Sequence, residues 1–270
     1  MTLAQALVLV VAAALGGALN SVAGGGSFLT FPALAWTGVP LIQANATSTM
    51  ALWPGSVASV GAYRRELAGR RGVRLLGAIS LVGGALGALV LLGTPQATFQ
   101  RLLPYLLLSA TLIFAFGGRV AARLRRPRGP VAGGAPAGPG GPERAAEPAV
   151  SLVWLCLLQA VIAFYGGFFV GGIGILMLAG LALAGMEDIH AMNAVKTLLA
   201  VLINGVAVAI FVWKGAIYWP EAAVMVAGAV AGGYGGAHYA RRLPPVVVRR
   251  GVLAAGCTLT VYFFYRAYLQ

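Results

Sequence analysis

Long apolar runs with almost no charge recur along the whole chain and leave few folds open to it. Of the 270 residues, 60% are hydrophobic and 9% are charged, whereas about a quarter of the residues in a soluble globular domain are charged. Such runs cross a membrane as helices, because lipid offers no partner to unpaired backbone groups. A β-barrel would show short alternating strands instead. The prediction is an all-α polytopic, multi-pass protein of the cytoplasmic membrane.

Five apolar segments precede a polar stretch, and five follow it. We expect them at about 3–22, 27–38, 42–63, 74–93, 101–121, 150–170, 173–186, 191–213, 219–240 and 249–269. Residues 123–148 between the two sets are rich in Pro, Gly, Ala and Arg, a composition that forms no packed core. This pattern predicts an N-terminal transmembrane repeat at 1–122, a flexible cytoplasmic linker at 123–148 and a C-terminal transmembrane repeat at 149–270.

Two of the segments are short, and each follows a run of glycines. Residues 27–38 would form a helix of roughly 18 Å and residues 173–186 one of roughly 21 Å, less than the ~30 Å hydrocarbon core. At an offset of 147, Gly24 and Gly25 fall on Gly171 and Gly172. We therefore expect each repeat to contain a broken helix followed by a half-helix, as in transporters built from internal repeats.

Charge predicts how the two repeats are oriented. Loop 64–74 holds five arginines and its counterpart at 213–219 one lysine, whereas loop 94–101 holds one arginine and its counterpart at 241–250 four. Basic loops lie on the cytoplasmic side, so the two repeats are expected to be inverted. The net charge of +13 then reflects membrane topology, and we expect no nucleic-acid partner.

The two breaks and the residues after them also resemble a known family. The first half reads GGGSFLTFPALAWTGVP and then QANATS, and the second reads GGIGILMLAGLALAGMEDIHAMNAVKT. Both stretches resemble the sulfite exporter TauE/SafE family of membrane transporters, and the likeness extends over nearly the whole chain outside 123–148. The resemblance implies transport of sulfite or other sulfur-containing anions, including organosulfonates.

The glycine breaks predict an anion site. Broken backbone within a membrane persists only where it is buried or lines a cavity, and a helix N-terminus carries roughly half a positive charge. Two such ends from inverted repeats would meet near the midplane and bind an anion through backbone N–H groups. The alternative is that the glycines serve only close helix packing.

Lys196 is the charged residue that lies clearly inside an apolar segment. An intramembrane lysine usually faces a cavity and functions there, although snorkelling to an interface is the alternative. Ser48 holds the matching position in the first repeat, and we expect the two side chains to face each other. The polar residues around them are expected to open the helix after each half-helix, where ordinary capping is the alternative. The predicted substrate-binding residues are Gly24, Gly25, Gly26, Asn45, Thr47, Ser48, Gly171, Gly172, Asn193, Lys196 and Thr197.

Glu187, Asp188 and His190 lie between the second half-helix and the helix of Lys196. They are candidates for proton coupling or gating, since histidine titrates near neutral pH, and a solvated loop is the alternative. The sequence contains no catalytic constellation, cofactor motif, metal-ligand spacing or P-loop, which argues against an enzyme or a primary pump. The prediction is a secondary transporter that exports a small sulfur-containing anion. A passive anion channel, or a transporter of another small organic anion, is the alternative; ion coupling and a homodimer stay open.

Overall fold

The structure is a computed structural model in which the described residues form helices and no strands. It describes residues 1–22, 25–62, 71–124, 151–184, 186, 188–239 and 245–268. The helices are α1 (Leu3–Val22), α2 (Ser27–Trp36), α3 (Leu41–Ala62), α5 (Arg71–Gly93), α6 (Gln96–Leu124), α7 (Leu152–Phe168), α8 (Ile173–Leu183), α9 (Ile189–Trp213), α10 (Trp219–Tyr239) and α11 (Pro245–Tyr268). The predicted all-α fold is confirmed.

The described helices have the lengths and surfaces of a membrane protein. By length and composition, four stretches could cross a membrane: Leu3–Asn20, Gly72–Gly93, Gln96–Phe116 and Ala191–Trp213. Large apolar side chains lie on the outside of the bundle, among them Val161 at 66% exposure and Trp213 at 76%. Such a surface is stable in lipid and would be costly in water.

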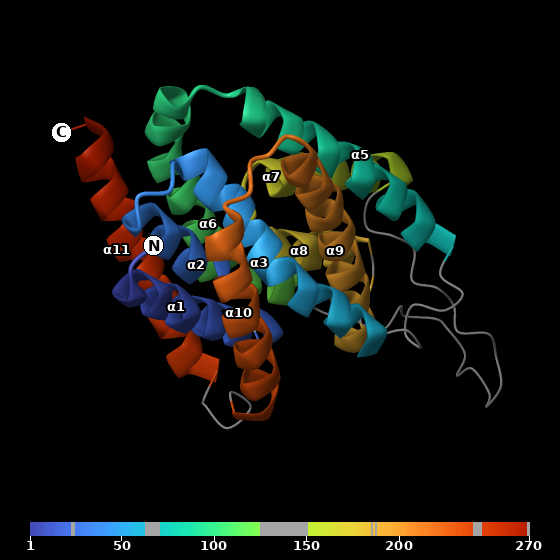
Figure 1. Cartoon of the computed structure of the whole chain (residues 1–270). Coiled ribbons are helices and arrows are strands. Elements are labelled where there is room, and N and C mark those ends of the chain that lie inside the picture. The colour runs from blue at the N-terminus through green and yellow to red at the C-terminus, as the bar shows by residue number, and fades with distance from the viewer. Residues whose placement is uncertain are drawn as a thin grey trace, which may run out of the picture.

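The two short helices are where the sequence predicts them. The half-helix α2 has 10 residues and α8 has 11, so they measure about 15 and 16 Å, too short for a ~30 Å hydrocarbon core. Figure 1 shows both within the body of the molecule, among longer helices. Their position away from lipid agrees with the requirement that broken backbone be buried.

Two predicted segment starts are wrong. The helix α6 begins at Gln96 instead of residue 101, and α11 begins at Pro245 instead of 249. Proline is well tolerated at the first position of a helix, where its missing N–H costs nothing. The start of α6 is held against α3, because Gln96 Nε2 donates to Gln43 Oε1 at 2.6 Å. Of the predicted linker 123–148, residues 123 and 124 belong to α6 and the remainder lies outside the described residues.

The backbone conformation at the two breaks is the same. Gly25, two residues before α2, has φ of 91°, and Gly172, immediately before α8, has φ of 82°. These are the residues that the sequence aligns at an offset of 147. Side chains other than glycine are strained at such angles, so both breaks depend on glycine at that position.

Helices of the first half pack between helices of the second. The helix α1 packs against α10, and α5 packs against α7. The contact of α3 with α10 corresponds to that of α9 with α5. The half-helix α2 contacts α1 and α3, and correspondingly the half-helix α8 contacts α7 and α9. Each helix of the first half has a counterpart in the second: α1 and α7, α2 and α8, α3 and α9, α5 and α10. When every helix is exchanged for its counterpart, each of these contacts becomes another contact of the same set. The fold therefore repeats its packing as well as its breaks.

The two closest crossings are made by glycines. A Cβ at Gly232 in α10 would overlap the carbonyl oxygen of Ala14 in α1, and a Cβ at Gly87 in α5 would overlap that of Phe164 in α7. Small residues spaced four apart allow helix backbones in a membrane to approach this closely, and dispersion contacts then hold them together.

Replacing Gly232 with alanine should push α1 away from α10. The added methyl has no room, and overpacking of this kind costs about 1–3 kcal/mol. The neighbouring Gly233→Ala is the matched control, because its nearest neighbour is Gly17 O at 3.9 Å. We expect thermal unfolding in detergent to show a lower Tm for Gly232→Ala alone. Equal Tm values for the two variants would contradict this account of the crossing.

Candidate anion-binding site

The N-terminal turn of α8 begins at the left-handed residue Gly172. The first hydrogen bonds of the helix are donated by the amides of Ile175 and Leu176, both to Gly172 O, at 3.2 and 3.4 Å. The amide groups of Ile173 and Gly174 stand ahead of these donors. A helix leaves its first N–H groups without intrahelical partners, and its dipole makes that end positive.

Lys196 of α9 lies beside this turn. A Cβ added to Gly174 would be 3.6 Å from Lys196 Cδ, so the aliphatic stem passes along the first turn of α8. The ammonium Nζ donates to Asn193 Oδ1 at 3.1 Å, one turn back on α9. The half-buried lysine thus adds a full positive charge next to the partial charge of the helix end. This combination is suited to an anion.

The two breaks meet at a small cavity of about 10 Å³. It is lined by Ser27, Phe28, Phe31, Asn45, Leu107, Phe169 and Gly171, which come from the start of α2, from α3 and α6, and from the chain before α8. A space of about this size holds one water molecule. Asn45 reaches across the two halves, because its Nδ2 donates to Phe168 O at the end of α7 at 3.2 Å.

The two half-helix ends differ in their capping. Asn20, near the end of α1, accepts a hydrogen bond from the Gly26 amide through Oδ1 at 2.9 Å. Gly26 is the N-cap of α2 and packs directly on the Gly16 carbonyl. A side chain therefore already satisfies one amide at the α2 end. The position that aligns with Asn20 is Gly167, which has no side chain to do the same for α8.

Asn45 and Asn193 are inside their helices and do not open them. Each is the fifth residue of its helix, α3 or α9, so the expectation that these two residues open the helices is wrong by one turn. The equivalence between the two positions holds, because Thr49 donates to Asn45 O and Thr197 donates to Asn193 O, both at 2.7 Å. Thr197 makes this bond within its own helix.

Ser48 and Thr47 have structural partners. Ser48 Oγ lies 2.6 Å from Thr30 Oγ1 of α2 and is 2% exposed, so this pair ties α3 to the first half-helix. Thr47 Oγ1 accepts the Tyr218 amide at 3.1 Å and holds the segment before α10. Ser48 bonds to α2, whereas Lys196 bonds to Asn193 within α9; that the two side chains face each other stays a prediction.

The predicted coupling residues lie around the start of α9. Asp188 is exposed and its carbonyl accepts the Met192 amide at 2.9 Å. His190 belongs to the first turn of α9. Gly24 and Glu187 lie outside the described residues.

Several residues of the site were missed in the sequence. Asn20 and Thr30 could have been found as polar residues beside a glycine break in an apolar run. The aromatic walls gave no such signal, because Phe31 and Phe169 read as ordinary core. The tertiary structure shows their rings 6.2 Å apart, edge to face, at the cavity.

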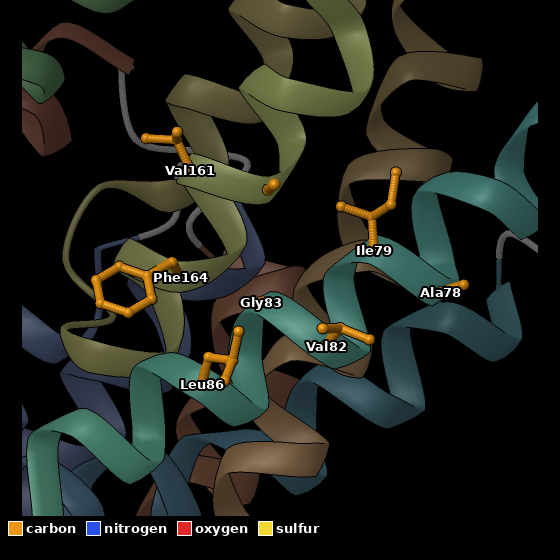
Figure 2. A pocket seen from close by; sticks show the side chains of 8 residues that line it. Ala78, Ile79, Val82, Gly83, Leu86, Val161 and Phe164 are labelled. Carbon is orange, nitrogen blue, oxygen red and sulfur yellow. The ribbon is translucent and has the colours of Figure 1, made fainter. Parts of the chain in front are cut away.

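A larger hollow lies elsewhere in the described part of the chain and is apolar. Figure 2 shows this groove between α5 and α7, about 620 Å³, lined by Ala78, Ile79, Val82, Gly83, Leu86, Ala160, Val161 and Phe164. It offers no charge or hydrogen-bond donor to an anion, and its exposed aliphatic side chains fit lipid.

Comparison with known proteins gives a consistent result. The sequence profile of the sulfite exporter TauE/SafE family matches residues 9–263. A probable membrane transporter protein of Haemophilus influenzae is 27% identical over 92% of this chain and 89% of its own. The probable membrane transporter protein ORF9 of a Sinorhizobium species is 29% identical over 86% and 82%. The probable membrane transporter protein YfcA of Escherichia coli K12 is 24% identical over 97% and 91%. No solved structure matches.

These bacterial relatives are named probable membrane transporter proteins, and a membrane transporter family is not an enzyme class. The prediction of a multi-pass membrane protein is confirmed by them and by the apolar helices. Because the profile covers almost the whole chain, this protein belongs to the sulfite exporter TauE/SafE family of membrane transporters.

Proposed function

We propose that the chain is a secondary transporter that exports a small sulfur-containing anion, sulfite or an organosulfonate, across the cytoplasmic membrane. The observation that carries the proposal is the position of Lys196 against the first turn of α8, with Asn193 as its hydrogen-bond partner. A tetrahedral or pyramidal oxyanion presents several acceptor oxygens. It can therefore take N–H donors from the helix end and from the ammonium at once.

The cavity at the two breaks suggests how transport proceeds. Its volume of about 10 Å³ suits a water molecule and is too small for an oxyanion. Phe28, Phe31 and Phe169 form much of its wall. In the proposed mechanism this conformation is closed, and the helices around the two breaks separate to admit the anion from one side at a time.

The exchange symmetry of the helix contacts supports inverted repeats. The first helix of each half packs on the fourth helix of the other half, an arrangement that two-fold-related repeats produce. Together with the exchange of basic loops between halves, it favours opposite topology of the two repeats. Alternating access then follows from rocking one set of helices against the other around the site.

A passive anion channel is the second candidate. The closed apolar wall between the two breaks favours a transporter, because a channel keeps a continuous polar path when open. Counterflow in proteoliposomes separates the two: a transporter shows saturable exchange of labelled for unlabelled anion, and a channel does not.

Replacing Lys196 with methionine removes the charge and keeps the length. We expect affinity for sulfite or methanesulfonate to fall by about 1–3 kcal/mol, the contribution of a hydrogen bond to a charged group. Stability should stay the same or rise, because an intramembrane charge is lost. Binding is measured by isothermal titration and stability by Tm.

Lys214→Met is the matched control for this test. Lys214 is exposed, and its Nζ lies 4.4 Å from the centre of the Trp213 ring, so its loss should leave anion affinity unchanged. If Lys196→Met binds the anion as tightly as the wild type, Lys196 has no role in the site and only backbone dipoles are left.

Replacing Gly172 with alanine should damage the site through the backbone. The added Cβ has room, since its nearest neighbour is Ala110 Cα at 3.5 Å, but φ of 82° strains it by about 1–2 kcal/mol. Relief of that strain turns the first amides of α8, so we expect anion affinity to fall. Gly38→Ala is the control, with φ of 93° and nothing within 4 Å. Equal anion affinity in the two variants would show that the break only serves packing.

Inverted topology is tested by cysteine labelling. In a chain with Cys156 and Cys257 replaced by serine, Ala68→Cys and Pro245→Cys should react with an impermeant maleimide only after permeabilisation. Lys214→Cys, in the short connection between α9 and α10, should react from outside. A cysteine at 68 or 245 that labels only from outside would refute the inverted assignment.

A further inference from the structure

The apolar groove between α5 and α7 has no part in the proposed anion site. It has a volume of about 620 Å³ and follows residues 78–86 of α5, a length of about 12 Å. Val161 and Phe164 of α7 form its other side (Figure 2). Because Val82, Leu86, Val161 and Phe164 are all exposed, the groove opens to the outside of the bundle. In a membrane a hydrocarbon chain fills such a hollow, since an empty one loses dispersion contacts.

The two helices that form the groove run in the same direction. Gln159 Nε2 of α7 donates to Ser80 Oγ of α5 at 2.8 Å, in the buried seam beneath the groove. About two turns further along each helix, a Cβ at Gly87 would lie 3.0 Å from the carbonyl carbon of Gly167. Successive contacts therefore advance along both helices together, and α5 and α7 begin at the same end of the groove.

That end of the groove carries a cation and a large aromatic side chain. The exposed Arg74 lies one turn before Ala78 on α5, and Trp154, 67% exposed, lies two turns before Val161 on α7. Spacings of four and seven residues place each of them on the helix face that carries the groove residue. Side chains on a helix tilt toward its N-terminus, so both extend away from the hydrocarbon. Arginine and tryptophan at such a level anchor a helix among lipid headgroups.

The opposite end of the groove carries no charge. After Leu86, α5 ends with GALVLLG, and after Phe164, α7 ends with YGGF. The groove is therefore apolar along its length and positively charged at one end only. A molecule that matches it has a long hydrocarbon chain and a negatively charged group at the Arg74 end. The planar guanidinium can donate two N–H groups at once to a phosphate.

We propose that this groove is a binding site for an anionic phospholipid, with one acyl chain along residues 78–86 and the headgroup phosphate at Arg74. Basic sites between transmembrane helices recognise anionic headgroups in this way. The apolar walls accept any lipid chain, so the selectivity comes from the arginine. The basic loop 64–74 is expected on the cytoplasmic side, which assigns the lipid to the cytoplasmic leaflet. The inference does not depend on which anion the protein transports.

The test is a lipid titration of the purified, delipidated protein in detergent. Native mass spectrometry measures the affinity for the first bound lipid, and thermal unfolding measures Tm. The probes are dioleoylphosphatidylglycerol, which is anionic, and dioleoylphosphatidylcholine, which has the same chains and no net charge. We expect tighter binding of phosphatidylglycerol and a higher Tm, because a ligand of the folded state stabilises it. Glycerol 3-phosphate, which has the anionic group without the chains, should leave Tm unchanged.

Two substitutions separate the headgroup from the chain. Arg74→Gln should lower the affinity for phosphatidylglycerol about five-fold, the effect of one basic residue near an anionic surface, and leave that for phosphatidylcholine unchanged. Ala78→Leu fills the groove and should weaken binding of both lipids. The controls are Arg250→Gln, at an exposed arginine near the start of α11, and Ala227→Leu, at an exposed alanine of α10. Both controls lie outside the groove and should bind both lipids as the wild type does.

Several results would overturn the inference. The wild type could bind both lipids equally, Arg74→Gln could keep the full preference for phosphatidylglycerol, or glycerol 3-phosphate could raise Tm as much as the lipid does. A second copy of the chain seated in the groove would appear as a dimer that Ala78→Leu converts to a monomer, and the occupant would then be protein. Should Ala78→Leu not fold, Ala160→Leu replaces it, because Ala160 lines the same groove from α7.

Discussion

The structure depends on the cost of leaving backbone groups unpaired in a membrane. Gly25 and Gly172 turn the chain into a conformation that only glycine adopts without strain. Each lies just before a short helix, whose first amides lipid cannot satisfy. The two short helices that follow must therefore lie inside the protein, and the remaining helices must surround them. Unpaired amides at the breaks would destabilise the fold if lipid reached them. The same amides are the N–H donors of the candidate anion site.

The surrounding helices meet that requirement by pairing across the two halves. Gly232 and Gly87 permit α1 and α5 to approach their partners at backbone distance, which seals the outside of the bundle without charged or bulky side chains. Because each pair joins one half to the other, neither half completes its own enclosure. Opening the site then has to involve movement between groups of helices drawn from both halves.

Small differences between the repeats make the two halves of the candidate anion site unequal. Asn20 caps the start of α2, whereas Gly167 leaves the start of α8 without an equivalent cap. Ser48 is bonded to Thr30, whereas Lys196 in the matching position extends along α8. If the proposed function holds, the anion is therefore expected closer to the second half.

The sequence by itself determined the class of fold, the ten helices of the described residues and both breaks. It could do so because hydropathy and glycine act locally and lipid removes the alternatives. It also identified Lys196, since a charge in an apolar run is costly wherever that run packs. Only the tertiary structure decided which helices adjoin, that Asn45 and Asn193 lie a turn inside their helices, that Ser48 bonds to α2, and that Thr47 accepts the Tyr218 amide before α10. Those outcomes depend on side-chain directions across helix pairs that are far apart in the chain.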